Sequence, residues 1–326
     1  MIATTRRTLG GLAAGVLLPT VASAQAPWPQ RPLRWIVPYA AGGGSDFLAR
    51  TLAAAVGNAI GQAIAVENRG GGATIPATQM AAQSAPDGYT LLSADLTALV
   101  ITPAMARRLP YDPIRDFRPV APIARFPYVI LVHPDVPARS AAELIALARA
   151  RPNTLNFAHA GTGTPNHLGT ERLIRATGIQ VTQVSYRGGA PAVTDLVAGV
   201  VQASVSDYAS AAPAIQGGRV RAVGIPAPQR LDLLPDVPTL AEQGINGADV
   251  YSWQGVAVPA GTPDAVVVRL QAELERALRN PEIAQRLRSV SLEPFPGSSE
   301  QMRDLIASET AVWGPLIREL GITLDS

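Results

Sequence analysis

The sequence predicts an α/β protein with two lobes, and two observations support this prediction. The chain has 326 residues, whereas single hydrophobic cores stop growing near roughly 250 to 300 residues. Short β-rich runs alternate with amphipathic helical stretches, a pattern typical of helices packed on parallel sheets. The alternation occurs in two separate series, so we expect each lobe to contain its own sheet.

The first 24 residues are predicted to be an export signal and not a part of the fold. Arg6 and Arg7 precede an apolar stretch over residues 9–22, and residues 22–24 (ASA) have the small-x-small pattern that a signal peptidase needs. The apolar stretch is shorter than the roughly 20 residues that span a bilayer. We therefore expect cleavage after Ala24 and a soluble periplasmic protein, with the general and the twin-arginine export routes both left open.

The first series of elements starts directly after the signal. Apolar residues recur at helical spacing between residues 46 and 60, and Gly61 follows them as a helix-ending glycine. The expected elements are a strand at 33–37, a glycine-rich turn at 40–45, a helix at 46–60, a strand at 64–66, a helix at 75–84 and a strand at 89–93.

The second series begins at the run YVILV, residues 128–132. Ser140 and Glu143 form a capping-box pattern at the start of the next helix. The expected elements continue with strands at 155–159 and 181–184, helices at 164–176 and 190–198, a last strand at 253–258, and helices at 263–278, 281–287 and 299–320.

The two lobes are expected to be joined by two chain crossings, near residues 126 and 251. The last strand and the helices after it are interpreted as the chain returning to the first lobe. The predicted organisation is therefore lobe 1 at 25–126 and 251–326, and lobe 2 at 127–250, with the crossings acting as a hinge.

The composition excludes several classes of function. The chain has no cysteine, so disulfides, thiolate nucleophiles and cysteine-based metal sites are excluded. The formal net charge is only +2, and the arginines are dispersed singly without a basic run beside aromatic residues. We therefore expect no nucleic acid partner.

A glycine-rich turn between a strand and a helix is the strongest signal for a binding site. Gly42, Gly43 and Gly44 let the backbone approach a ligand closely, and the helix that starts at Ser45 and Asp46 offers free N–H groups and a partial positive charge. The turn lacks the lysine of a phosphate-binding P-loop and the spacing of a dinucleotide fingerprint. A purely structural role is the alternative, because a carboxylate in a first helical turn also stabilises the helix dipole.

A second turn of the same kind lies in the other half of the chain, where residues 161–167 (GTGTPNH) again separate a strand from a helix. Two anion-binding helix starts, one in each lobe, predict a ligand that is held from both sides. Helix capping is the alternative for this turn, and packing is the alternative for its histidine. The candidate residues here are Gly161, Thr162, Gly163, Thr164 and His167.

Two further loops are expected at the same edge of the sheets, at residues 186–189 (YRGG) and 204–208 (SVSDY). They add Tyr186 and Asp207 as candidates, although Tyr186 is also suited to a core position and Asp207 to a turn cap.

Catalysis is disfavoured by the same residues. Ser45, His167 and Asp207 are the available triad, but no G-x-S-x-G elbow exists. None of the three histidines is paired with another across a glutamate at zinc-binding spacing. We therefore expect no catalytic residue, no metal and no cofactor, and we keep a periplasmic hydrolase of acids or esters as the alternative from another class.

The motifs resemble those of the Bug family of extracytoplasmic solute receptors, the binding-protein component of tripartite tricarboxylate transporters. The resemblance covers essentially the whole mature chain. The matching blocks are residues 28–50, 61–75, 85–92, 109–124, 159–168, 184–201, 234–244 and 253–263. It implies the type II periplasmic-binding-protein (Venus-flytrap) fold, with two α/β lobes and two crossing hinge strands.

The resemblance also implies a site and partners. The ligand is a small organic carboxylate, held by loops that match residues 40–45 and 161–167, and the segment at 94–100 is expected to face the cleft and select the ligand's tail. Ala41 stands where the family usually has a proline, so the first loop is expected to be less rigid. The residues that match the family's site are combined here with the candidates named above and with Tyr39 beside the first loop. The full set of candidate ligand-binding residues is Tyr39, Ala40, Gly42, Gly43, Gly44, Ser45, Asp46, Gly161, Thr162, Gly163, Thr164, His167, Tyr186 and Asp207.

The expected partners are the membrane subunits of such a transporter, with a sensor kinase as the alternative partner. A monomer is the expected state, as in other receptors of this type. The identity of the carboxylate is not specified by the sequence.

Overall fold

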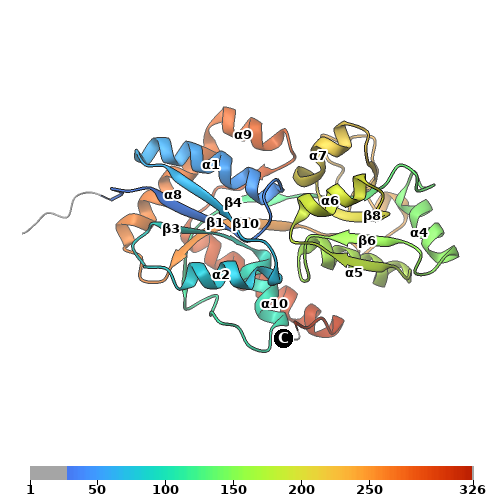
Figure 1. The fold of residues 1–326 in the computed structure, drawn as a ribbon, viewed down its shortest axis with the longest axis horizontal. Helices are drawn as coiled ribbons and strands as arrows, with labels where there is room; N and C mark the ends of the chain where they lie inside the picture. Colours follow the sequence, from blue (N-terminus) through green and yellow to red (C-terminus); the bar gives the residue numbers. More distant parts are fainter. Residues whose placement is uncertain (1–27, 325–326) are drawn as a thin grey trace, which may run out of the picture.

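The protein is described here from a computed structural model, which describes residues 28–324. The predicted export signal at residues 1–24 lies outside this range. The elements form two lobes side by side along the long axis (Figure 1), each built around one sheet. No helix within residues 28–324 is long and apolar enough to cross a membrane.

Lobe 1 is the half of the molecule around a six-stranded sheet with the strand order β11-β4-β10-β3-β1-β2. These strands are β1 (Leu33–Val37), β2 (Ile64–Asn68), β3 (Thr90–Asp95), β4 (Phe117–Phe126), β10 (Ser252–Pro259) and β11 (Glu293–Pro294). Its helices are α1 (Gly44–Ile60), α2 (Ile75–Ala82), α3 (Thr102–Met105), α8 (Asp264–Arg279), α9 (Pro281–Arg288) and α10 (Ser299–Leu320), with short helical turns η1 (Gly72–Thr74) and η2 (Thr97–Ile101).

Lobe 2 is the half around a five-stranded sheet with the order β7-β6-β8-β5-β9. These strands are β5 (Tyr128–Val132), β6 (Asn156–His159), β7 (Thr182–Ser185), β8 (Ala203–Asp207) and β9 (Arg221–Gly224). Its helices are α4 (Ala141–Ala150), α5 (Pro165–Thr177), α6 (Gly189–Val197) and α7 (Tyr208–Gln216), followed by the turn η3 (Ala241–Gln243).

Both sheets are mixed, which corrects the expectation of parallel sheets. In lobe 1, β1 is parallel to β2 and β3, but β10 runs antiparallel to β3 and β4. In lobe 2, β5 runs antiparallel to β8 and β9. The antiparallel pairs arise where the chain enters or leaves a lobe, because a strand that arrives from the other lobe runs against the βαβ units already there.

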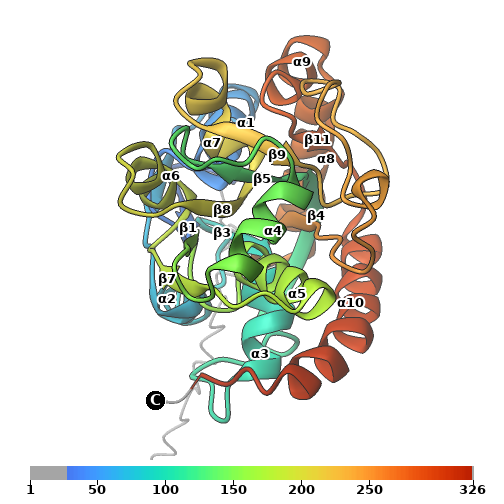
Figure 2. The ribbon, with the colours of Figure 1, turned by 90° about the vertical axis from the view of Figure 1, so that its right-hand side faces the viewer.

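Helices cover both faces of each sheet because the strands alternate their side chains between two apolar layers. In β1, Trp35 packs in the same cluster as Leu52 of α1 and Leu270 of α8, whereas Ile36 packs on the opposite face with Ile306 of α10. The C-terminal helices therefore belong to lobe 1, and α10 runs along its side (Figure 2). The apolar layer that contains Trp35 continues into lobe 2, where Ile130 and Phe157 belong to the same cluster.

Two short crossings join the lobes. Pro127 is the one residue between the end of β4 at Phe126 and the start of β5 at Tyr128. The chain returns through Tyr251 into β10, which starts at Ser252. In this structure the crossings lie at residues 127 and 251.

Several elements differ from the sequence prediction, and two of them bear on the site and on the crossings. The segment at 204–208, expected as a loop, is mostly the buried central strand β8, followed by the start of α7. Strand β4 was not expected, because Pro119 and Pro122 lie within it.

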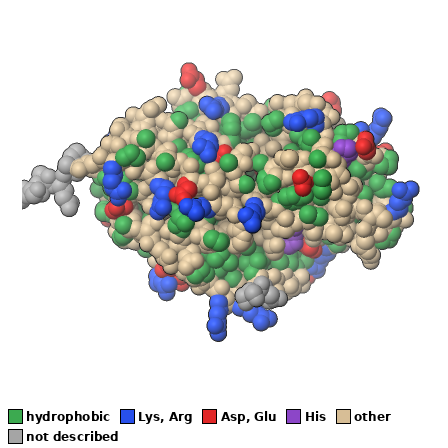
Figure 3. Space-filling model, in the orientation of Figure 1, with side chains coloured by type: hydrophobic (Ala, Val, Ile, Leu, Met, Phe, Trp, Pro, Cys, Tyr) green, Lys and Arg blue, Asp and Glu red, His purple; other side chains and the backbone are tan. Residues whose placement is uncertain are grey.

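On the face seen in Figure 3, charged side chains are scattered singly over both lobes and form no large patch of one sign.

Candidate ligand-binding site

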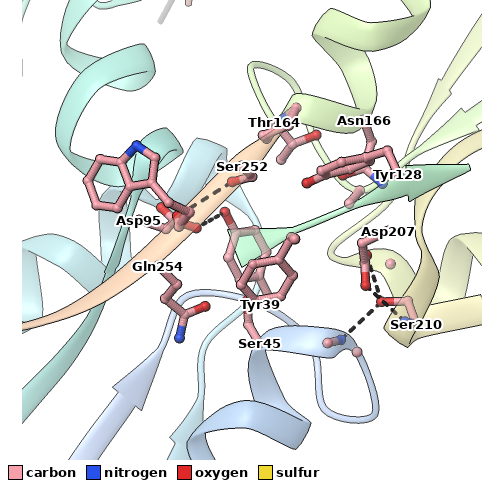
Figure 4. Close-up of a pocket in the computed structure, with 17 residues that line it drawn as sticks. Tyr39, Ser45, Asp95, Tyr128, Thr164, Asn166, Asp207, Ser210, Ser252 and Gln254 are labelled. Carbon is pink, nitrogen blue, oxygen red and sulfur yellow. Dashed lines mark hydrogen bonds between the residues drawn. The ribbon is translucent and has the colours of Figure 1, made fainter. Parts of the chain in front are cut away.

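A small cavity of about 40 Å³ lies between the two lobes, beside both crossings. That is room for a few water-sized groups, since one water needs roughly 10 to 15 Å³ by this measure. The residues around it come from both lobes (Figure 4). They are Tyr39, Gly43, Gly44, Ser45, Asp95, Phe126, Tyr128, Ala160, Thr164, Pro165, Asn166, Gly189, Asp207, Ser210, Ser252, Trp253 and Gln254.

The starts of four helices meet at this cavity. Gly44 and Ser45 open α1 of lobe 1, and Asn166, Gly189 and Ser210 lie in the first turns of α5, α6 and α7 of lobe 2. The first N–H groups of a helix have no partner inside the helix, and the helix dipole adds a partial positive charge there. The cavity is therefore suited to an anion, although no arginine, lysine or histidine is among the described residues that line it.

The predicted site residues fall into three groups. The cavity is lined by Tyr39, Gly43, Gly44, Ser45, Thr164 and Asp207. A second hollow of about 270 Å³ is lined by Gly161, Thr162 and Tyr186, and it shares Tyr39 and Thr164 with the first. Neither space is lined by Ala40, Gly42, Asp46, Gly163 or His167.

Two residues of the last group support the loops from behind. Asp46 accepts a hydrogen bond from the amide of Gly42 at 3.0 Å and pairs with Arg50 at 2.9 Å. Burial alone would raise the pKa of Asp46, but these partners lower it overall. His167 accepts from the amide of Gly163 at 3.1 Å through Nδ1. These side chains fix the shape of each turn while the backbone of the turn faces the other lobe.

His167 also stacks against His159 at the end of β6, with ring centroids 4.6 Å apart. Burial lowers the pKa of both imidazoles to about 4. Both rings are therefore neutral near pH 7 and add no positive charge to the anion site.

The bond between the Tyr39 hydroxyl and Asp95 forms one wall of the cavity. The hydroxyl donates to Oδ2 of Asp95 at 2.5 Å, and the amide of Ala98 donates to Oδ1 at 2.8 Å. Burial raises the pKa of Asp95 to about 6 and that of Tyr39 well above its ordinary value. Asp95 is thus a buried carboxylate that is charged at neutral pH and has no cationic partner in the cavity.

A second buried carboxylate connects the lobes on the opposite side. Asp207 accepts hydrogen bonds from the amide and the hydroxyl of Ser210, each at 2.8 Å, and so caps α7. The Ser210 hydroxyl accepts in turn from the amide of Gly44 at 3.0 Å. Burial raises the pKa of Asp207. Since both of its oxygens are used by Ser210, its role in this structure is to hold two helix starts together.

Several lining residues were not among the sequence candidates. Phe126, Tyr128, Ser252, Trp253 and Gln254 all lie within three residues of a crossing, so the predicted crossings were the signal that could have located them. Asp95 lies in the segment 94–100, which the family resemblance linked to ligand selection. No group of three or more acidic or histidine side chains within residues 28–324 is placed to hold a metal ion.

The profile of the "Tripartite tricarboxylate transporter family receptor" matches residues 48–322. The chain belongs to this receptor family. The resemblance recognised in the sequence is therefore confirmed, and the chain is a binding receptor rather than an enzyme, as expected.

Relatives of this receptor family align over almost the full chain. A protein encoded in the tcbD–tcbE intergenic region of Pseudomonas sp. strain P51 is 38% identical over 96% of this chain and 94% of its own. Protein BugT of Bordetella pertussis is 33% identical, with 95% of each chain covered. The structure of R. palustris Rpa4515 with adipate is similar at a TM-score of 0.88 and 33% identity, covering 91% of this chain and 99% of its own. The two-lobed receptor fold is thus confirmed.

Proposed function

We propose that this receptor binds one small organic carboxylate in the cavity between its lobes, in the periplasm, and delivers it to the membrane subunits of a tripartite transporter. The proposed contacts come from the two glycine-rich turns and the loops beside them, with Asp46 and His167 acting on turn shape. The protein works as a monomer, and its mature chain begins at Gln25 after cleavage behind Ala24.

The observation that carries the proposal is the convergence of four helix starts from two lobes on one cavity. An organic carboxylate has two oxygens that together accept about four hydrogen bonds. The amides of Ser45 in α1 and Asn166 in α5, which donate no hydrogen bond within residues 28–324, would meet such a group from opposite sides. Charge-assisted bonds of this kind contribute about 1.5 to 3 kcal/mol each, so four of them are enough for micromolar binding after the costs of ordering.

Contacts between the lobes support capture by closure. Besides the bond from Gly44 to Ser210, the amide of Ala40 donates to the carbonyl of Arg187 at 3.0 Å. Leu168 of α5 packs in an apolar cluster whose other members belong to lobe 1, among them Ile101 and Met105. A carboxylate that touches both lobes favours this closed arrangement because it makes all of its contacts only there.

A binding screen on the purified mature protein tests the proposal. Small carboxylates, sugars, amines and inorganic cations are compared by thermal shift and then by calorimetry. A carboxylate at about 100 times its Kd is expected to raise Tm by about 5 °C. Stabilisation by sugars or cations, with no response to any carboxylate, would contradict the proposal. Mass spectrometry of the exported chain checks the Gln25 start, and light scattering checks the monomer.

A further inference from the structure

The side chains that line the cavity carry negative charge and no positive charge, which is unexpected for a receptor that binds acids. Its described lining contains two carboxylates, Asp95 and Asp207, and no cationic side chain. Backbone N–H groups at the helix starts can stabilise the negative charge of one ligand carboxylate. A second carboxylate on the same ligand would have to lie near the buried negative charge of Asp95 or Asp207. Like charges in a dry site repel strongly.

The two acids are not equivalent. Both oxygens of Asp207 are engaged by Ser210 beside the start of α1, and an added Cβ on Gly44 would lie 2.6 Å from Oδ1. Asp207 therefore belongs to the contact between the lobes. Asp95 has one bond on each oxygen, from Tyr39 and from the amide of Ala98. Since a carboxylate oxygen accepts up to two bonds, Asp95 retains acceptor capacity.

Two neutral acceptors stand beside Asp95. The hydroxyl proton of Tyr39 is used in the bond to Asp95, so the tyrosine oxygen offers two lone pairs, one of which the Thr97 hydroxyl can use. Gln254 is only 1% exposed, its Nε2 donates to Ser93 at 2.8 Å, and its Oε1 is buried without a partner among the described residues. Figure 4 shows the Gln254 amide with its oxygen on the side of Tyr39 and Ser45. A buried carbonyl without a donor is costly and needs one.

We infer that the ligand carries a nitrogen donor, such as an ammonium group, that binds Tyr39, Asp95 and Gln254 while its carboxylate binds the helix starts. This inference rests on the proposed function and specifies it: the preferred class is amino acids and related zwitterions, and dicarboxylates of equal length bind more weakly. This preference differs from the adipate bound by the relative from R. palustris.

Calorimetry on length-matched acids tests the inference. Amino acids with one to five carbons between nitrogen and carboxylate are each compared with the diacid and the simple monocarboxylate of the same length. The best amino acid is expected to bind at least about tenfold more tightly than its matched diacid, as one charge-assisted bond allows.

Two variants, compared with a surface control, test whether Asp95 and Gln254 contribute to this preference. Asp95→Asn is expected to weaken the best amino acid about tenfold or more and to reduce its advantage over the diacid. Gln254→Met removes the free carbonyl and is also expected to reduce the advantage of the best amino acid over its matched diacid. Asp135→Asn is the matched control, because the side chain of Asp135 is 92% exposed. Circular dichroism at 25 °C verifies that each variant is folded.

The outcomes distinguish this inference from the proposed function. A diacid that binds more tightly than every amino acid would overturn the inference and leave the receptor function intact. So would an amino acid preference that is the same in the wild type, Asp95→Asn and Gln254→Met proteins. Failure of all the acids, with binding of a neutral or purely cationic compound, would overturn both.

Discussion

The backbone amide of Gly44 donates to the side-chain hydroxyl of Ser210 at 3.0 Å, and this bond joins α1 of lobe 1 to α7 of lobe 2. The same hydroxyl donates to Asp207 at 2.8 Å. The closed arrangement is therefore stabilised by a polar contact that involves no ligand atom. Changes at this contact are expected to alter affinity through the balance between open and closed forms.

Ser210→Ala is expected to weaken ligand binding about five- to a hundredfold. The substitution leaves the buried amide of Gly44 without an acceptor in the closed form, which costs about 1 to 3 kcal/mol. Calorimetry with the best ligand of the screen measures the change. Ser308→Ala on the exposed face of α10 is the control. Unchanged affinity in Ser210→Ala would mean that the contact is unimportant for closure.

Gly44→Ala is expected to block closure by a steric clash. An added Cβ would lie 2.6 Å from Oδ1 of Asp207 and 3.1 Å from the ring of Phe126. Affinity should fall by more than about tenfold, while the Tm of the ligand-free protein changes little because alanine favours a helix. Gly314→Ala in α10 is the matched control, since its Cβ would meet no atom closer than 3.5 Å. Normal affinity in Gly44→Ala would contradict the closed arrangement described here.

Asp95→Asn is expected to change how stability depends on pH. The pKa of Asp95 is raised from an ordinary 3.8 to about 6, so the folded protein binds a proton more readily than the unfolded chain. The stability of the wild type relative to the variant should thus fall as pH rises from 4 to 6, by up to about 3 kcal/mol, whatever the other titrating groups contribute to both proteins. Tm is measured for both from pH 4 to pH 7. A constant difference in Tm over that range would show that Asp95 titrates normally.

Acid should destabilise the protein through the stacked histidines. The pKa values of His159 and His167 are lowered from 6.5 to about 4, so the unfolded chain takes up protons first as pH falls. Their contribution is complete above pH 6.5 and is lost between pH 6.5 and 4. His159→Gln should lose less stability over this window than the wild type in chemical unfolding at each pH. An equal loss in both proteins would refute the neutral pair.

Most elements could be predicted because their sequence patterns agree with their burial, as in β1 and α1. Strand β4 could not, because proline removes a ladder hydrogen bond. Its register with β10 shifts at Gln254/Gly255 and Val256/Ala257, close to where Pro122 and Pro119 are paired, and β11 pairs only with residues 124 and 125. The prolines thus lie where the ladder is irregular and one edge is unpaired.

Strand β8 was missed for a different reason. Its sequence ASVSD contains three polar residues and is typical of a loop, yet all five positions are buried. Ser204 is tolerated there because its hydroxyl donates to the carbonyl of Ala158 on the neighbouring strand at 2.9 Å. Such a partner is distant in sequence and cannot be inferred from a local pattern.

The two glycine-rich turns of the candidate site were predicted from the sequence, whereas the Gln254 side chain that faces the cavity was not. Glycine-rich turns before helices carry a local signal, which is why Gly44 and Thr164 were named. Gln254 lies in a strand that is buried on both faces, so its polar side chain shows no alternation that would reveal which way it points. Its proximity to Tyr39 depends on the pairing of β10 with β3.

The first crossing limits how the receptor can move. With Pro127 alone between β4 and β5, the two sheets cannot slide apart, and the remaining freedom is a swivel about the backbone on either side of that proline, whose own φ is fixed. Phe126 and Tyr128 flank this axis and also line the cavity. A ligand in the cavity would therefore contact the residues on both sides of this swivel, so we expect the shape of the ligand to influence the angle between the two lobes.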